Sequence, residues 1–319
     1  MWNILILIGG FFPLIFGANY LVDYASSLAK KLNIPNIVIG LTIVAFGTSA
    51  PELIVNLFAA IHHNSALVLG NVIGSNLFNV MMILGLSAII YPLAVKSNTT
   101  WIEIPLCFLS SVLVIVVAND ILIDGSNQAI ISRTEGIILL FFFIIFLVYN
   151  IRAMLRGEIS DEVEVKDSSV LKSLLFILLG IVLLVIGGKA IEYSAVEVAK
   201  LLNISDRIIA LTIVSVGTSL PELATSLVAA KKRNTDIAIG NIVGSNIFNV
   251  FLILGVSSTV YPVVVSQESN IDMLLNVFIS LLLFIFVFTG RGRRIERWEG
   301  ILFVGFYLIY IVVLLTMKS

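Results

Sequence analysis

Ten apolar segments follow one another along the 319-residue chain, separated by short polar loops. Each is close to the roughly 20 helical residues needed to cross a hydrocarbon core of about 30 Å. The segments lack the alternation of a membrane β-barrel, and helices satisfy their own backbone groups in lipid. We therefore predict an all-α, polytopic membrane protein with ten transmembrane helices. They are placed at 4–22, 36–60, 66–93, 102–118, 133–153, 171–199, 207–230, 236–263, 273–289 and 298–317.

The chain matches itself when it is shifted by 170 residues. Ala29–Pro92 aligns with Ala199–Pro262 without a gap, and 34 of the 64 positions are identical. Each copy holds five predicted spans, and because five is odd the second copy must enter the membrane from the opposite side. Inverted repeats of this kind place a binding site near the midplane, where the halves meet. We predict repeats at residues 1–155 and 171–319, joined by an acidic linker at 156–170.

Composition and charge place this fold in a membrane. Hydrophobic residues make up 59% of the chain and charged residues 12%, against about 45–50% and 25% in soluble domains. The net charge is −1 with no long basic tract, so we expect no nucleic-acid partner. With the N-terminus outside, 14 basic residues fall in inside loops and 4 outside. The positive-inside rule then puts both termini outside a plasma or inner membrane and the linker in the cytoplasm.

Two acidic residues, Glu52 and Glu222, lie deep in the best-matched spans. A charge at the membrane centre costs at least about 2.5–3.5 kcal/mol, so such residues are functional by default. The same segments hold no basic residue at membrane depth that could neutralise them. Each Glu follows a proline, Pro51 or Pro221, which breaks a helix and frees backbone carbonyls. Irregular backbone at this depth is tolerated where it is buried or lines a cavity, and we predict a cation site there.

The helix after each broken span carries a polar stripe on one face, at positions i, i+4 and i+8. The stripes are Asn71, Ser75 and Asn79, and Asn241, Ser245 and Asn249. Such side chains also join membrane helices by hydrogen bonds, a role that better suits Asn71 and Asn241. The donor set is all oxygen, without sulfur or imidazole. Ca2+ takes 6–8 oxygens in flexible geometry and soft metals are disfavoured, so the set fits one Ca2+ or a few Na+.

Other classes of function find less support. We find no nucleophile–base arrangement, phosphate loop or cofactor fingerprint. We therefore expect a protein that is not an enzyme, with no cofactor and no obligate protein partner beyond the lipid bilayer. A cation channel needs a continuous wet pore, whereas an inverted repeat with a single compact midplane site favours a carrier.

The paired GTSxPE and GNxxGSN blocks resemble the α-repeats of the Ca2+/cation antiporters, especially those of the Na+/Ca2+ exchanger branch. The resemblance covers the ten-span layout and is most specific over residues 36–93 and 206–263. It implies that Glu52 and Glu222 are shared ligands for Ca2+ and Na+, and that the first and sixth spans slide against the other helices. The further residues it implies are Thr48 and Thr218 through their backbone oxygens at the Ca2+ position; Ser49, Ser219, Ser75, Ser245 and the carbonyls of Ala45 and Ser215 at flanking Na+ positions; and Asn79 and Asn249 at the centre.

Two departures from the family pattern bear on the coupling ion. The proton-coupled branch carries a further acid in a GNxxE pattern, where this chain has Gly74 and Gly244. Some exchangers of the Na+ type, including K+-dependent ones, carry Asp where this chain has Asn249. We therefore expect a Ca2+/Na+ antiporter, with a Ca2+/H+ antiporter on the same fold as the alternative.

Overall fold

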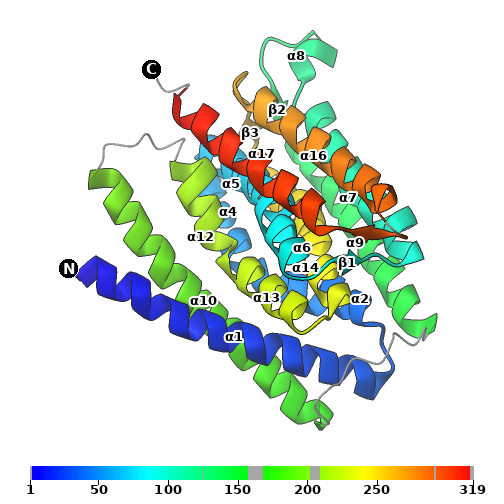
Figure 1. Ribbon diagram of the computed structural model, residues 1–319. Coiled ribbons are helices and arrows are strands. Elements are labelled where there is room, and N and C mark those ends of the chain that lie inside the picture. Colours follow the sequence, from blue (N-terminus) through cyan, green and yellow to red (C-terminus); the bar gives the residue numbers. More distant parts are fainter. Residues whose placement is uncertain (1, 124, 157–167, 202–208, 291, 317–319) are drawn as a thin grey trace.

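A computed structural model describes residues 2–123, 125–156, 168–201, 209–290 and 292–316, which are almost entirely helical (Figure 1). The predicted acidic linker at 156–170 lies mostly outside the described residues. Within them, seven helices are long and apolar enough to cross a membrane, and two bent helix pairs raise the number to nine. The seven are α5–η2–α6 (Ser65–Ile90), η3–α7 (Thr99–Val117), α9 (Arg133–Arg156), α10 (Val170–Leu201), α14–η5–α15 (Thr235–Val260), α16 (Ser269–Thr289) and α17 (Arg297–Thr316).

The first helix, α1 (Trp2–Leu32), is longer than the apolar run that predicted it. Sequence placed this span at 4–22, but the helix continues for ten more residues. Its second half is held by polar contacts with the turn between α13 (Leu220–Lys231) and α14 (Thr235–Ile247). There the Asp23 carboxylate lies 2.5 Å from Lys232 Nζ, and Asn234 Nδ2 donates to Ser26 Oγ at 2.9 Å. An apolar window cannot detect a helical extension that is stabilised by polar partners 208 and 209 positions away.

The two bent pairs are the predicted broken helices. In the first half, α2, η1 and α3 (Asn36–Ile39, Gly40–Val44 and Ala45–Thr48) bend by 48° into α4 (Ala50–Ile61). In the second half, η4 and α12 (Ile209–Val214 and Ser215–Thr218) lead into α13, with a bend of 51° measured from Thr212. Each break falls at the serine of the GTSxPE block, two residues before the proline. The first turn of the new helix tolerates proline, because the N–H that proline lacks would have no partner within the helix at that position.

Two long helices form the centre of the bundle. In the most apolar stretch of each helix, protein buries 94% of Thr235–Val260 and 78% of Ser65–Ile90. The equivalent share in α9 is 22%. Close approach is possible because of glycine: a Cβ on Gly240 would lie 3.0 Å from the Cα of Gly40. On Gly244 it would lie 2.9 Å from the Ala45 Cβ. The GxxxG spacing of Gly240 and Gly244 thus allows α14 to lie directly against the first broken helix.

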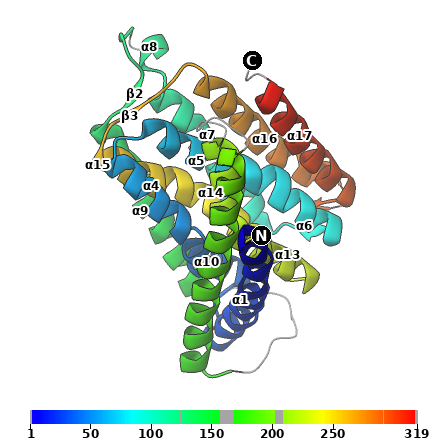
Figure 2. The same ribbon diagram turned by 90° about the vertical axis from the view of Figure 1, so that its left-hand side faces the viewer.

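Helices α1 and α10 lie side by side along one flank of the bundle (Figures 1 and 2). Their backbones approach at two glycine pairs. A Cβ on Gly17 would lie 2.7 Å from the carbonyl oxygen of Gly180, and one on Gly10 would lie 2.9 Å from that of Gly187. A contact this close between backbones packs the two helices into one unit.

Within the described residues, four strands of two residues each lie in the loops, a small departure from the all-α prediction. Strand β1 (Leu93–Ala94) pairs antiparallel with β4 (Arg294–Ile295), and β2 (Ile130–Ile131) with β3 (Val263–Val264). Each two-stranded sheet therefore joins a loop of the first repeat to a loop of the second. The strands β1 and β3 occupy positions 170 residues apart, so the arrangement repeats the symmetry of the sequence.

Candidate functional site

The two helix breaks face each other, and each serine at a break donates to the carboxylate of the other. Ser49 Oγ donates to Glu222 Oε1 at 2.8 Å, and Ser219 Oγ donates to Glu52 Oε1 at 2.9 Å. Both carboxylates are 1% exposed. The second oxygen of each, Oε2, is buried and accepts no hydrogen bond from the described residues. The structure thus brings the two predicted carboxylates into one closed, reciprocal arrangement.

The backbone hydrogen bonds that cross each break leave the threonine carbonyl unused. Two bonds cross the first break, from Ser49 N–H to the Ala45 carbonyl at 2.9 Å and from Leu53 N–H to the Ser49 carbonyl at 3.1 Å. The equivalent bonds in the second break measure 3.1 and 3.0 Å. Neither pair uses the carbonyl oxygen of Thr48 or Thr218, the two oxygens expected at the Ca2+ position.

The threonine side chains are engaged elsewhere. Thr48 Oγ1 donates to Asn241 Oδ1 at 3.0 Å, and Thr218 Oγ1 donates to Asn71 Oδ1 at 3.2 Å. Both bonds cross between the two halves of the chain. Asn71 and Asn241 therefore join helices, as the sequence predicted for them.

The remaining predicted residues are not equivalent in the two halves. Ser245 Oγ lies 3.0 Å from Ser49 Oγ and donates to Glu222 Oε1 at 3.3 Å, so it belongs to the carboxylate network. Its counterpart, Ser75, instead donates to the Ser215 carbonyl at 3.4 Å. That carbonyl also accepts from Ser219 N–H at 3.1 Å, and the Ala45 carbonyl likewise accepts the N–H of Ser49. These two carbonyls have a lone pair engaged already, whereas the Thr48 and Thr218 carbonyls are not used across the breaks.

The central asparagines lie in π-helical segments. Asn79 is in η2 (Phe78–Leu84) and Asn249 is in η5 (Phe248–Leu254). Wide turns of this kind are frequent at functional sites, because they re-aim side chains that a regular helix would place elsewhere. Asn79 Nδ2 donates to Asn246 Oδ1 at 2.9 Å, and Asn249 Nδ2 donates to Asn76 Oδ1 at 3.0 Å. Neither Asn79 Oδ1 nor Asn249 Oδ1 has a partner among the described residues, and both are buried.

Asn76 and Asn246 were not among the predicted site residues. They fall off the i, i+4, i+8 stripe, so helical periodicity gave no reason to choose them. The available signal was the repeat itself, because each is the last residue of a GNxxGSN block.

Among the predicted site residues, four buried oxygens thus have no protein donor within the described chain: Glu52 Oε2, Glu222 Oε2, Asn79 Oδ1 and Asn249 Oδ1. Native structures satisfy most buried polar atoms, so such a group of orphans calls for an explanation such as a bound ion. No group of three or more His, Cys, Asp or Glu in the described chain could hold a metal. A cation here would combine two carboxylates with neutral amide and backbone oxygens, which is the chemistry of hard ions.

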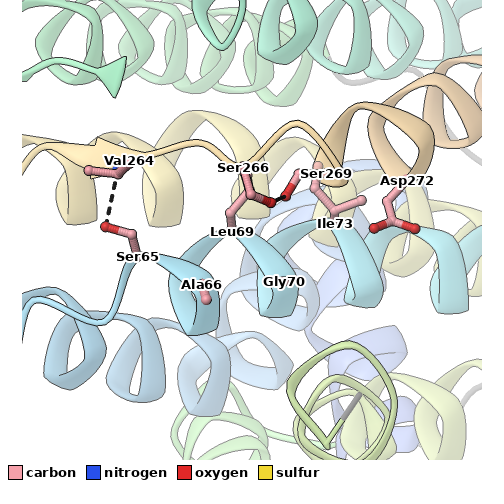
Figure 3. Close-up of a pocket in the computed structure, with 9 residues that line it drawn as sticks. All are labelled: Ser65, Ala66, Leu69, Gly70, Ile73, Val264, Ser266, Ser269 and Asp272. Carbon is pink, nitrogen blue, oxygen red and sulfur yellow. Dashed lines mark hydrogen bonds between the residues drawn. The ribbon is translucent and has the colours of Figure 1, made fainter. Parts of the chain in front are cut away.

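A separate cavity of about 70 Å³ lies at the start of α5 (Figure 3). It is lined by Ser65, Leu69 and Ile73 on one side of α5 and by Ser266 and Asp272 from the loop after β3 and from α16, among others. None of the predicted site residues lines it.

Comparison with known proteins agrees with this geometry. A family model described as sodium/calcium exchanger protein matches residues 2–152 and 172–316. This chain belongs to the sodium/calcium exchanger family. It is 33% identical to the sodium/calcium exchanger MaX1 of Methanosarcina acetivorans over 344 residues, which cover 98% of both chains. It is 31% identical to the inner membrane protein YrbG of Escherichia coli K12 over 323 residues, covering 97% of this chain and 95% of YrbG.

Among solved structures, the sodium-calcium exchanger NCX_Mj soaked with 10 mM Na+ and zero Ca2+ superposes with a TM-score of 0.82. The sequences are 33% identical, and the match covers 97% of this chain and 98% of that one. The family resemblance stated from sequence is therefore confirmed, and the protein is a membrane transporter of the exchanger family. The two halves matched by the family model leave out residues 153–171, nearly the predicted linker.

Proposed function

We propose that this protein exchanges Ca2+ for Na+ across the cell membrane by alternating access. The observation that carries the proposal is the group of four orphan oxygens on Glu52, Glu222, Asn79 and Asn249. Two carboxylates match the charge of one Ca2+, and the amide and freed backbone oxygens extend the set toward the 6–8 ligands that Ca2+ takes. The names of MaX1 and NCX_Mj, both sodium/calcium exchangers, support the same pair of ions.

The proposed ligands fall into two groups around Asn79 and Asn249, which lie at the centre of the cluster. At the Ca2+ position, Glu52 and Glu222 act with the backbone oxygens of Thr48 and Thr218. At flanking Na+ positions, serine hydroxyls and two further backbone carbonyls act together with the same two carboxylates, so the two ions compete for the site. The residues proposed for Na+ are Ser49, Ser219, Ser75 and Ser245 with the carbonyls of Ala45 and Ser215. Competition at shared oxygens is what couples the two ions, since neither can occupy the site with the other bound.

The proposed architecture has ten transmembrane helices in two inverted repeats, at residues 1–155 and 171–319. Counting α1, the nine candidate spans become ten, and the midplane position of both breaks follows from the inversion. The linker at 156–170 is cytoplasmic and both termini are extracytoplasmic, as the positive-inside rule indicates. In this arrangement α1 and α10 move together as one unit, because their glycine contacts hold the two backbones in register.

Sodium is favoured over protons as the coupling ion. The proton-coupled branch places an acid where Gly74 and Gly244 stand here, and a Cβ on Gly244 would already lie 2.9 Å from the Ala45 Cβ. A carboxylate at that position would not fit without moving the first broken helix. The site therefore has two carboxylates rather than a further pair for protons.

The test is Ca2+ uptake into proteoliposomes with pH and voltage clamped. Vesicles loaded with Na+ should accumulate Ca2+ against its own gradient when the outside is Na+-free, and this accumulation should stop when Na+ is equal on both sides. Uptake driven by a proton gradient without any Na+ would replace the proposal by Ca2+/H+ exchange. Uptake that needs no counter-ion gradient would indicate a channel.

A further inference from the structure

Two asparagines outside the proposed ligand set control which end of the neighbouring amide faces the ion. An asparagine side chain presents an oxygen on one side and an NH2 group on the other. For Asn79 and Asn249 to offer an oxygen to a cation, each NH2 group needs an acceptor on the far side. Asn246 Oδ1 and Asn76 Oδ1 are those acceptors, at 2.9 and 3.0 Å.

Both pairs join the two halves of the chain. The Asn79–Asn246 bond spans 167 residues and the Asn249–Asn76 bond spans 173. All four side chains are buried, at 0 to 1% exposure. Because these side chains are closed to water, rotating the Asn79 or Asn249 amide by half a turn would cost its NH2 group the hydrogen bond to the protein. The rotation would also point that NH2 group toward the site.

From this geometry we infer that Asn76 and Asn246 are positioning residues that hold the Asn249 and Asn79 carbonyls toward the transported cation. The inference rests on the proposed function, since it assumes that the site between Glu52 and Glu222 binds cations. Neither Asn76 nor Asn246 is a ligand in this proposal. Each acts only through the asparagine whose NH2 group it accepts.

The two positioning residues are held differently. Asn246 Nδ2 lies 3.5 Å from the Asn76 backbone carbonyl, so its own amide is oriented by the main chain. Asn76 Nδ2 has no acceptor among the described residues. The Asn76 amide can therefore turn around without losing a donor bond, whereas that of Asn246 cannot. As a result, Asn76 can serve either an amide or a carboxylate at position 249.

The first test compares two replacements of Asn76 by equilibrium Ca2+ binding to the purified full-length protein in Na+-free detergent solution. Asn76→Leu removes the acceptor and should weaken Ca2+ binding about tenfold, the worth of one oriented hydrogen bond in a buried site. Asn76→Asp keeps an acceptor for Asn249 Nδ2 and should bind Ca2+ at least as tightly as wild type. The matched control is Asn150→Leu, which removes a buried amide bonded only within its own helix, to the Phe146 carbonyl at 2.9 Å.

The second test asks whether the pairing is specific. In wild type, Asn249→Asp should tighten Ca2+ binding, because Asn76 can turn its NH2 group toward the new carboxylate. On the Asn76→Asp background the same change places two carboxylates about 3 Å apart, where one retains a proton, so the gain should disappear. Asn79→Asp should have the same effect on that background as in wild type, because Asn79 pairs with Asn246 and not with Asn76.

The outcomes separate the two proposals. No Ca2+ binding by wild type would overturn the proposed function and this inference with it. Binding by wild type, with Asn76→Leu equal to wild type, would overturn the inference alone. So would an undiminished gain from Asn249→Asp on the Asn76→Asp background. If Asn76→Leu fails to fold, the comparison on the Asn76→Asp background still decides the matter.

Discussion

Replacing one site carboxylate by its amide should nearly abolish Ca2+ transport while leaving the fold intact. In Glu52→Gln the side chain keeps its shape, and its carbonyl oxygen still accepts the Ser219 hydroxyl that Glu52 Oε1 accepts at 2.9 Å. The formal charge of the site falls from −2 to −1. Two unit charges 4 Å apart attract by about 4 kcal/mol at an effective dielectric constant of 20, and a divalent ion doubles this. Ion desolvation offsets much of that gain, and removal of one partner from a close charge pair typically costs about 2–5 kcal/mol. Ca2+ affinity should therefore fall by about 30-fold or more.

The assay is Ca2+ uptake into Na+-loaded proteoliposomes, with the melting temperature of each variant measured in detergent. Glu222→Gln should match Glu52→Gln, because both carboxylates face one ion. The control is Glu135→Gln, since Glu135 Oε2 accepts the Ser132 N–H at 2.6 Å in a helix cap that Gln also supports. It should transport normally. Near-normal Ca2+ uptake by a folded Glu52→Gln protein would refute the assignment of the site.

Three further changes test other parts of the structure. Ile61 and Lys231 are exposed and lie 170 positions apart, so a cysteine at Ile61 should react with impermeant reagents from outside and one at Lys231 from the cytoplasmic side. The single native cysteine is buried. Labelling of both positions from the same side would contradict the inversion. Gly17→Ala should lower the melting temperature, because the added Cβ would lie 2.7 Å from a backbone oxygen of α10 and overpacking of this kind costs about 1–3 kcal/mol. Gly9→Ala is the control and should be neutral, because a Cβ there meets nothing within 4 Å. Thr48→Val keeps the backbone carbonyl and removes the hydroxyl, which lies 3.0 Å from both Asn241 Oδ1 and the Val44 carbonyl. Ca2+ affinity should fall by no more than about tenfold, and a loss as large as that of Glu52→Gln would make the hydroxyl itself a ligand.

Much of this protein was determined by sequence alone. Apolar length predicted the membrane class, and the shift of 170 residues predicted the two repeats and the equivalence of Glu52 and Glu222. Pro51 and Pro221 predicted the breaks, which the structure places within one or two residues. These features are local: a proline without an N–H and a charge in an apolar span have the same consequence in any surroundings. Local chemistry is therefore enough to read them from the sequence.

Other features were decided only by the tertiary structure. The extension of α1 to Leu32 depends on partners in the second half of the chain. Ser75 and Ser245 occupy equivalent positions in sequence, yet only Ser245 donates to a carboxylate. The roles of Asn76 and Asn246 depend on which end of an amide faces which neighbour. Hydrogen-bond direction between side chains about 170 positions apart leaves no periodic pattern in the sequence, because it is set by how the two inverted halves pack together.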